Sequence, residues 1–169
     1  MNKFRIAMGV ALLCTSALYA QQMPLKRLAV ISDVHLMAPS LLQKEGKAFD
    51  NYIKMLVESS ELLDSVSKHL IAYQPQIIFI TGDLTKDGER ISHLLLVDRY
   101  LKPLKAQGIR IYVVPGNHDV NNPHAKVYNG DNAQRTTTVS AKDFTHIYND
   151  YGYGEALATD PNSLSYVVQ

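Results

Sequence analysis

Five residues of metal-binding type follow three apolar runs in this sequence. The residues are Asp33, His35, Asp83, Asn117 and His118, and the apolar runs that precede them are residues 28–32, 77–81 and 109–114. Carboxylate, imidazole and amide groups form a mixed set of oxygen and nitrogen ligands, which suits Mn, Fe or Zn better than a metal that prefers thiolates. Two such ions a few ångström apart can clamp a phosphate group and activate a water that bridges them.

The spacing of these residues predicts how they share the ions. Asp33 and His35 are two positions apart in extended chain, where alternate side chains point to one side, so both can reach the same ion. Asp83 follows a separate run and can bridge two ions with its two carboxylate oxygens. Asn117 can supply a neutral carbonyl oxygen.

His118 lies beside Asn117 and need not bind metal itself. An imidazole at this place can donate a hydrogen bond or a proton to the oxygen that leaves a phosphate ester. Asp119, the next residue, could orient the imidazole ring. His118 is therefore the candidate catalytic residue.

Each of the three groups also has a plainer interpretation when it stands alone. An Asp-x-His pair is usually a surface pair or a helix cap, and the Gly-Asp pair at residues 82–83 is common turn chemistry. The Gly-Asn-His-Asp group at residues 116–119 is more specific, because turn propensity explains Gly-Asn but not the His-Asp that follows. All three groups in order, each after an apolar run, favour a functional site.

Together the groups resemble the motifs of the calcineurin-like metallophosphoesterase superfamily, over residues 28–119. The resemblance implies an α/β/β/α sandwich that holds a two-metal site. It implies that Asp33 and His35 bind the first ion and that Asp83 bridges the two. It also implies that Asn117 binds the second ion and that His118 acts on the substrate phosphate or the leaving group. The implied activity is metal-dependent hydrolysis of a small phosphate ester.

The residues after Asp83 depart from two branches of this superfamily. Purple acid phosphatases have a tyrosine three residues after the bridging Asp, where this sequence has Lys86, which argues against a purple iron site. Serine/threonine phosphatases have an Asp there that orients the catalytic histidine, whereas the nearest carboxylate here is that of Asp87. The Gly-Asp-Leu-Thr sequence at residues 82–85 is more similar to the branch of bacterial cyclic-nucleotide phosphodiesterases, which favours a phosphodiester substrate.

The superfamily also has three further metal-binding histidines downstream, two of them in a Gly-His-x-His pattern, and this pattern does not occur here. Of the histidines that follow His118, we interpret His124 as a loop or substrate-side residue and His146 as a half-exposed helical residue. His69 and His93 lie in helical stretches and are expected at the surface.

The missing histidines support a second hypothesis, an incomplete or non-catalytic phosphoesterase-like module that binds a partner or one metal ion. Four protein ligands are too few for two ions that each need about four to six bonds. We therefore expect residues 21–169 to be the amino-terminal half of a larger enzyme, with at most one weakly bound ion and negligible turnover. A Rossmann-type nucleotide binder is disfavoured, because no G-x-G-x-x-G follows the first apolar run.

The order of apolar patterns predicts an α/β fold. Residues 28–32, 77–81 and 109–114 are expected to form buried strands, and the helical spacing of apolar residues predicts helices at about 49–73 and 89–106. Strands that alternate with helices indicate a mostly parallel sheet with flanking helices. With the resemblance, this is the amino-terminal half of an α/β/β/α sandwich.

Finer features of these elements can also be predicted. The apolar residues expected on the inner face of the second helix are Leu94, Leu95, Val97, Leu101 and Leu104. Pro103 should bend the last turn of that helix, and Gly108 should end it. Residues 120–139 have no periodicity and are expected to form a long loop near the site. A helix capped by Ser140 should reach Tyr151, and residues 164–168 should begin another strand.

The composition suits one globular domain, over residues 21–169, because 46% of the 169 residues are hydrophobic and the net charge is +1. No basic excess points to nucleic acid. Residues 1–20 combine a positive start, an apolar run and a small residue at Ala20, which is typical of a signal peptide and predicts an exported, periplasmic or secreted protein with no membrane span after its removal. The alternatives are a retained anchor, a buried first helix, or lipidation at Cys14.

Overall fold

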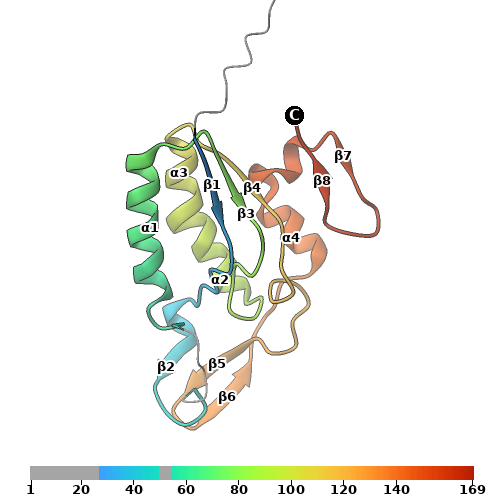
Figure 1. Cartoon of the computed structure of the whole chain (residues 1–169). Helices are drawn as coiled ribbons and strands as arrows, with labels where there is room; N and C mark the ends of the chain where they lie inside the picture. The colour runs from blue at the N-terminus through green and yellow to red at the C-terminus, as the bar shows by residue number, and fades with distance from the viewer. Residues whose placement is uncertain (1–26, 50–54) are drawn as a thin grey trace, which may run out of the picture.

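A computed structural model describes residues 27–49 and 55–169 of the chain. Its centre is a three-stranded parallel sheet in the order β1 (Leu28–Ile31), β3 (Ile77–Ile80) and β4 (Arg110–Val113). Figure 1 shows helices α1 (Ser59–Tyr73) and α3 (Lys102–Ala106) side by side along this sheet, with α4 (Ala141–Ile147) on the β4 side. The three predicted strands, their parallel order and the flanking helices are confirmed.

The first strand is not fully buried, contrary to expectation. β1 lies at the edge of its sheet, and the Val30 side chain is 60% exposed. The central strand β3 buries Ile78 and Ile80, and β4, the other edge strand, buries Ile111 and Val113. Continuous apolar sequence therefore predicted all three strands but not how much of each would be exposed.

The first helix begins later than its apolar spacing predicted. Residues 56–58 form a turn and α1 begins at Ser59, while residues 50–54 of the expected helix lie outside the described residues. The Ser59 hydroxyl donates to the Leu56 carbonyl at 2.7 Å and accepts from the Met37 N–H at 3.1 Å, which fixes the turn before the helix. The helix ends at Gln74, whose φ is +50°, as the Gln-Pro pair predicted.

The second helix is confirmed over residues 90–106, but its middle is irregular. α2 (Arg90–Leu95) continues into a π-helical segment, η2 (Leu96–Leu101), and then into α3. Of the residues expected on the inner face, Val97, Leu101 and Leu104 are buried, whereas Leu94, which precedes the π-helical segment, is 41% exposed.

The sequence predicted that this helix bends at Pro103 and ends at Gly108. Pro103 is the second residue of α3, and the π-helical segment ends two residues before it, so the helix departs from regular α geometry next to the proline. Gly108, with φ +80°, follows the helix end and donates to the Lys105 carbonyl at 2.9 Å, so the predicted glycine stop is confirmed.

The stretch 120–139 is not a plain loop, contrary to expectation. It contains an antiparallel hairpin of β5 (Lys126–Asn129) and β6 (Asn132–Arg135), and β5 also pairs in parallel with β2 (Leu42–Lys44), which follows the short 3₁₀ helix η1 (Pro39–Leu41). All four residues of β6 are exposed, so the segment has no apolar alternation to reveal a strand.

The carboxyl-terminal part contains α4, two short 3₁₀ helices at Asn149–Tyr151 and Tyr153–Glu155, and a small hairpin. Ser140 and Asp143 form both bonds of the predicted capping box at the start of α4. The hairpin pairs β7 (Ala158–Thr159) with β8 (Tyr166–Val167), so the expected strand forms, although its Val167 is 57% exposed.

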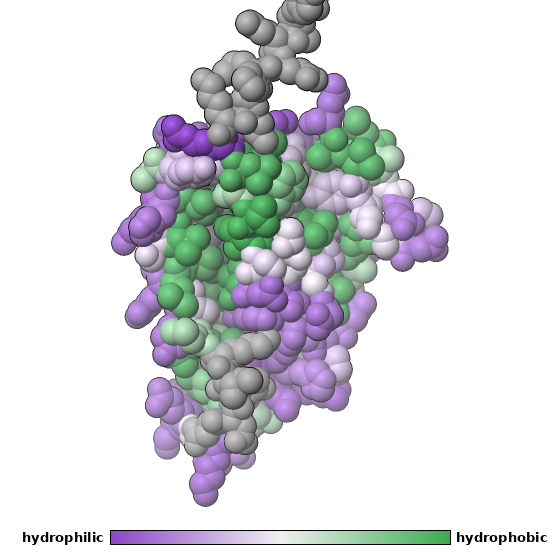
Figure 2. All heavy atoms as spheres, in the orientation of Figure 1, coloured by the Kyte–Doolittle hydropathy of each residue, from purple (hydrophilic) through white to green (hydrophobic). Residues whose placement is uncertain are grey.

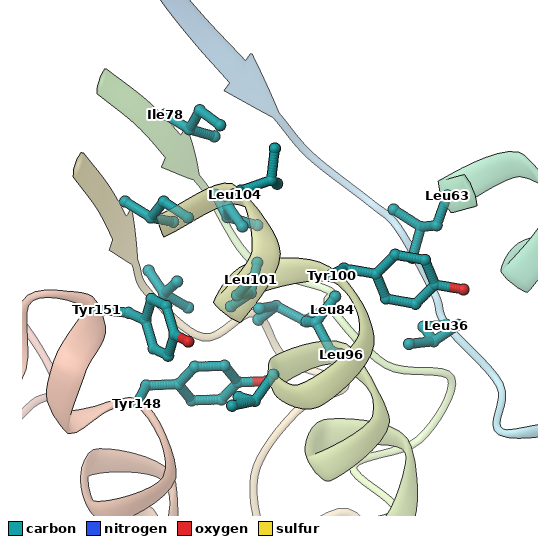
Figure 3. Close-up of a cluster of buried hydrophobic side chains, with 14 of the residues drawn as sticks. Leu36, Leu63, Ile78, Leu84, Leu96, Tyr100, Leu101, Leu104, Tyr148 and Tyr151 are labelled. Atoms are coloured by element: carbon teal, nitrogen blue, oxygen red, sulfur yellow. The ribbon is translucent and has the colours of Figure 1, made fainter. Parts of the chain in front are cut away.

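The main core lies between the sheet and the helices (Figure 3). Leu36 and Leu84 come from the loops after β1 and β3 and are fully buried there, and Tyr148 reaches the core from α4. Figure 2 shows apolar side chains gathered over β1 and α1 on the face toward the viewer. Within the described residues, no helix is both long enough and apolar enough to cross a membrane.

Candidate metal centre

The loops after β1 and β3 run side by side and place the first predicted ligands. Their backbones are joined because the Asp33 N–H donates to the Gly82 carbonyl at 3.2 Å and the His35 N–H donates to the Asp83 carbonyl at 2.8 Å. Asp33, His35 and Asp83 all adopt positive φ, at 55°, 44° and 49°. Non-glycine residues in this left-handed region are strained, and such strain persists only where surrounding contacts hold it.

The loop after β4 meets the other two through Gly116 and Asp119. A Cβ on Gly116 would lie 2.9 Å from Asp83 Cγ and closer still to Asp83 Oδ1, so only glycine lets the loops approach. The buried Asp119 carboxylate accepts the N–H groups of Thr85 at 2.9 Å and Gly116 at 2.8 Å. Asp119 therefore ties two loops together, and the expectation that its carboxylate orients His118 is wrong.

Three half-buried side chains converge where these loops meet. One nitrogen or oxygen each from His35, Asp83 and His118 lies within 4.8 Å of the others. His35 Nε2 is 3.8 Å from Asp83 Oδ2, and the His118 backbone N–H donates to Asp83 Oδ1 at 3.1 Å. The His35 imidazole and the Asp83 carboxylate are ligands that Mn, Fe and Zn accept, so these residues fit a metal ion, and the His118 ring lies beside them.

His118 is held from the side that faces away from this group. Its Nδ1 lies 2.6 Å from the Lys86 carbonyl oxygen and 3.2 Å from Asp87 Oδ1. Both partners are acceptors, so the hydrogen-bond pattern assigns the proton to Nδ1 and, in the neutral ring, leaves the lone pair on Nε2. Asp87 therefore contacts the histidine, although it stands one position later than in the serine/threonine phosphatases.

Comparison with known proteins agrees with this arrangement. The sequence model of the family described as calcineurin-like phosphoesterase matches residues 26–165. The chain belongs to the calcineurin-like phosphoesterase family. No curated protein sequence matches the chain closely enough for comparison. The family consists of metal-dependent hydrolases of phosphate esters, which is the reaction class of this phosphoesterase.

The phosphoesterase places two of its predicted ligands less centrally. Asp33 is exposed, its carboxylate is hydrogen-bonded to the Ser32 hydroxyl, and among the described residues it stands outside the group of three. Asn117 is exposed on the loop that carries His118. The structure thus joins His35 with Asp83 and His118, whereas Asp33 and Asn117 are exposed.

One predicted surface histidine is buried. His93 is fully buried, with Nε2 at 3.0 Å from the Asp119 carbonyl oxygen and Nδ1 at 2.8 Å from the Tyr148 hydroxyl. Burial lowers the pKa of His93, although the nearby Asp119 opposes that shift. The remaining histidines away from the site are exposed: His69, His124 and His146.

A hollow of about 410 Å³ lies beside the phosphoesterase site, between residues 31–35 and the start of α1. Asp33 and His35 line its polar end, while Leu62 and Val66 of α1 contribute to its apolar wall. A group bound at the site therefore has an open space next to the first two predicted ligands.

Proposed function

We propose that this phosphoesterase hydrolyses a small phosphodiester at a site for two metal ions. The observation that supports it is the group of His35, Asp83 and His118 at the meeting point of the three loops. In the proposed site Asp33 and His35 hold one ion, Asp83 bridges, and Asn117 holds the second. When bound, the ions supply positive charge for the phosphate and activate a water that bridges them.

His118 acts on the leaving group in this proposal. Its backbone N–H is fixed on Asp83, and its Nδ1–H is fixed on the Lys86 carbonyl and Asp87. A protonated His118 can donate its Nε2 proton to the departing oxygen, and the Asp87 carboxylate stabilises the positive ring. The geometry that orients the ring is thus already present in the chain.

The substrate preference can be measured with two chromogenic esters. Bis-p-nitrophenyl phosphate and p-nitrophenyl phosphate should be compared with manganese present and again after chelation. A faster, chelator-sensitive reaction of the diester is expected. A strong preference for the monoester would contradict the diester part of the proposal.

A second candidate function is a phosphoesterase-like module that binds one ion without turnover. The small number of grouped side chains favours this second candidate, because among the described residues Asp33 lies outside the group of His35, Asp83 and His118. The number of manganese ions bound per chain, measured together with diester hydrolysis, separates the two candidates. Two tightly held ions with turnover support the enzyme, and one weakly held ion without turnover supports the module.

A further inference from the structure

The loop between β3 and α2 buries three charged side chains beside His118. Lys86, Asp87 and Glu89 are all buried, and the Lys86 residue is only 1% exposed. Buried charges are destabilising unless they are paired and hydrogen-bonded. Three buried charges within four residues therefore call for an explanation, and no step of the proposed reaction uses the side chain of Lys86 or Glu89.

The contacts of Asp87 show what Lys86 and Glu89 do. Glu89 Oε2 accepts the Asp87 backbone N–H at 3.0 Å. Lys86 Nζ forms a hydrogen-bonded ion pair with Asp87 Oδ2. The remaining oxygen, Oδ1, lies 3.2 Å from His118 Nδ1. Asp87 is thus held at its backbone and at one carboxylate oxygen, while the other oxygen faces the histidine.

Lys86 is in turn held from three sides. Its Nζ lies 5.2 Å from the centre of the Tyr128 ring on β5 and 3.8 Å from Glu89 Oε1. Burial alone would lower the pKa of Lys86, but the hydrogen bonds with Asp87 and Tyr128 outweigh it and keep the pKa above its ordinary value. Lys86 therefore stays charged and separates two carboxylates that would otherwise repel each other.

We propose that Lys86 and Glu89 are positioning residues that hold the Asp87 carboxylate on His118 Nδ1. The proposal rests on the proposed function for the role of His118. Without the Lys86 ammonium group, Asp87 Oδ2 loses the ion pair that fixes the carboxylate, and Asp87 leaves the ring. The hairpin that carries Tyr128 then contributes to the orientation of a site residue on a different loop.

The direct test reads the His118 ring in the metal-free chain by ¹H–¹⁵N NMR. The Nδ1–H signal, assigned by its loss in His118→Gln, should be present and protected from exchange in the unmodified protein. Lys86→Met and Asp87→Asn should both shift this signal and speed its exchange with water, because the Lys86 carbonyl then remains as its acceptor without the Asp87 carboxylate, and Lys86→Arg should restore the original signal. Lys102→Met is the matched control, because it removes an exposed lysine of the Asp98 ion pair on α3 and should leave the signal unchanged.

A double variant separates positioning from stability. Lys86→Met leaves two buried carboxylates without a partner and lowers stability, whereas Lys86→Met with Glu89→Gln removes one of these charges and should recover most of the lost stability. The Nδ1–H signal should keep its shifted position and fast exchange in the double variant, because the Lys86–Asp87 ion pair is still absent. A signal that regains its original position together with stability, or that is unchanged in Lys86→Met, would show a purely structural role and overturn the proposal.

The rate provides a second readout that keeps the two proposals apart. In manganese-loaded protein, Lys86→Met should lower kcat by about 10- to 100-fold with KM changed by less than about 2-fold. If the unmodified protein has no turnover but the NMR signals behave as expected, the proposed function fails and the positioning stands. If turnover is normal in Lys86→Met, the positioning fails whatever the reaction is.

Discussion

At the scale of single residues, the two oxygens of Asp83 serve different neighbours. Oδ1 accepts the His118 backbone N–H, and Oδ2 faces His35 Nε2 at 3.8 Å. His118 is held at its ring nitrogen Nδ1, which contacts the Lys86 carbonyl and Asp87. A carboxylate oxygen beside His35 Nε2 suits a metal ligand, whereas an imidazole held at Nδ1 suits proton donation.

This difference predicts the behaviour of His118→Ala. The variant should keep its bound manganese and lose about 10²- to 10⁴-fold in the rate of diester hydrolysis, because general acid help contributes that much. Metal analysis and initial rates on the same sample check both parts. His69→Ala on the exposed face of α1 is the control. Release of the metal from His118→Ala would make His118 a ligand instead.

A second residue-scale prediction concerns the buried His93. Burial lowers its pKa below the ordinary value of 6.5, so under acidic conditions the unfolded chain binds a proton that the folded protein does not. Above pH 6.5, His93 therefore does not lower the free energy of unfolding. As the pH falls below that value, the free energy of unfolding decreases. The slope reaches at most about 1.4 kcal/mol per pH unit for one proton.

Denaturant unfolding at about pH 7.5 and pH 5.5 tests this sign. The unmodified protein should lose more stability on acidification than His93→Gln, while the exposed His69→Gln should follow the unmodified protein. An equal loss in His93→Gln and in the unmodified protein would show that His93 does not titrate on unfolding.

At the scale of elements, the site depends on how closely the loops after β3 and β4 approach. Gly116→Ala places a Cβ against the Asp83 backbone and carboxylate. Gly108→Ala is the matched control, because its φ is +80° but nothing lies within 4 Å of the added Cβ. The control should cost only about 1 kcal/mol of backbone strain.

Gly116→Ala should therefore destabilise more than the control and should also weaken manganese binding, because the clash moves Asp83. Denaturant unfolding and metal titration of both variants measure the two effects. Equal metal affinity in Gly116→Ala and Gly108→Ala would show that Asp83 does not depend on this contact.

The elements that sequence predicted well are those whose burial is regular. Apolar runs and helical spacing located β1, β3, β4 and the long helices, because each buries a continuous face. The hairpin of β5 and β6 was missed because β6 is polar and exposed, although the Asn-Gly-Asp sequence at 129–131 is a turn signal. The π-helical segment was missed because periodicity assumes one residue spacing throughout.

Part of the site could also not be predicted from the sequence, for a different reason. Motif spacing predicted that His35, Asp83 and His118 lie close together, and they do, since strand ends at one sheet edge meet in space. The burial of His93 and of Lys86 depends on partners far along the chain, Tyr148 and Tyr128, and no local pattern indicates it.

At the scale of the whole molecule, the metal group lies at the carboxyl ends of a parallel sheet whose β1 edge is exposed. Leu28 and Val30 of β1 are exposed, and Figure 2 shows apolar side chains over β1 and α1 on one face. Contiguous exposed apolar surface favours binding to other apolar surfaces. The site and this face share the hollow beside His35.

Export is the prediction that belongs to the chain as a whole. Residues 1–20, which lie outside the described residues, have the pattern of a signal peptide, so the mature protein should begin at Gln21. Mass spectrometry of the protein recovered from cell envelopes and medium measures the first residue. A chain that still begins at Met1 in those fractions would contradict export by cleavage.

The central claim is that Asp83 holds metal within the group it forms with His35 and His118, and manganese binding to two proteins tests it most directly. The metal-free chain and its Asp83→Asn variant should be titrated in parallel, with Asp98→Asn as an exposed control. Binding that is chelator-sensitive in the unmodified chain and in Asp98→Asn, and lost in Asp83→Asn, is the expected result. Full manganese occupancy in Asp83→Asn would contradict the account.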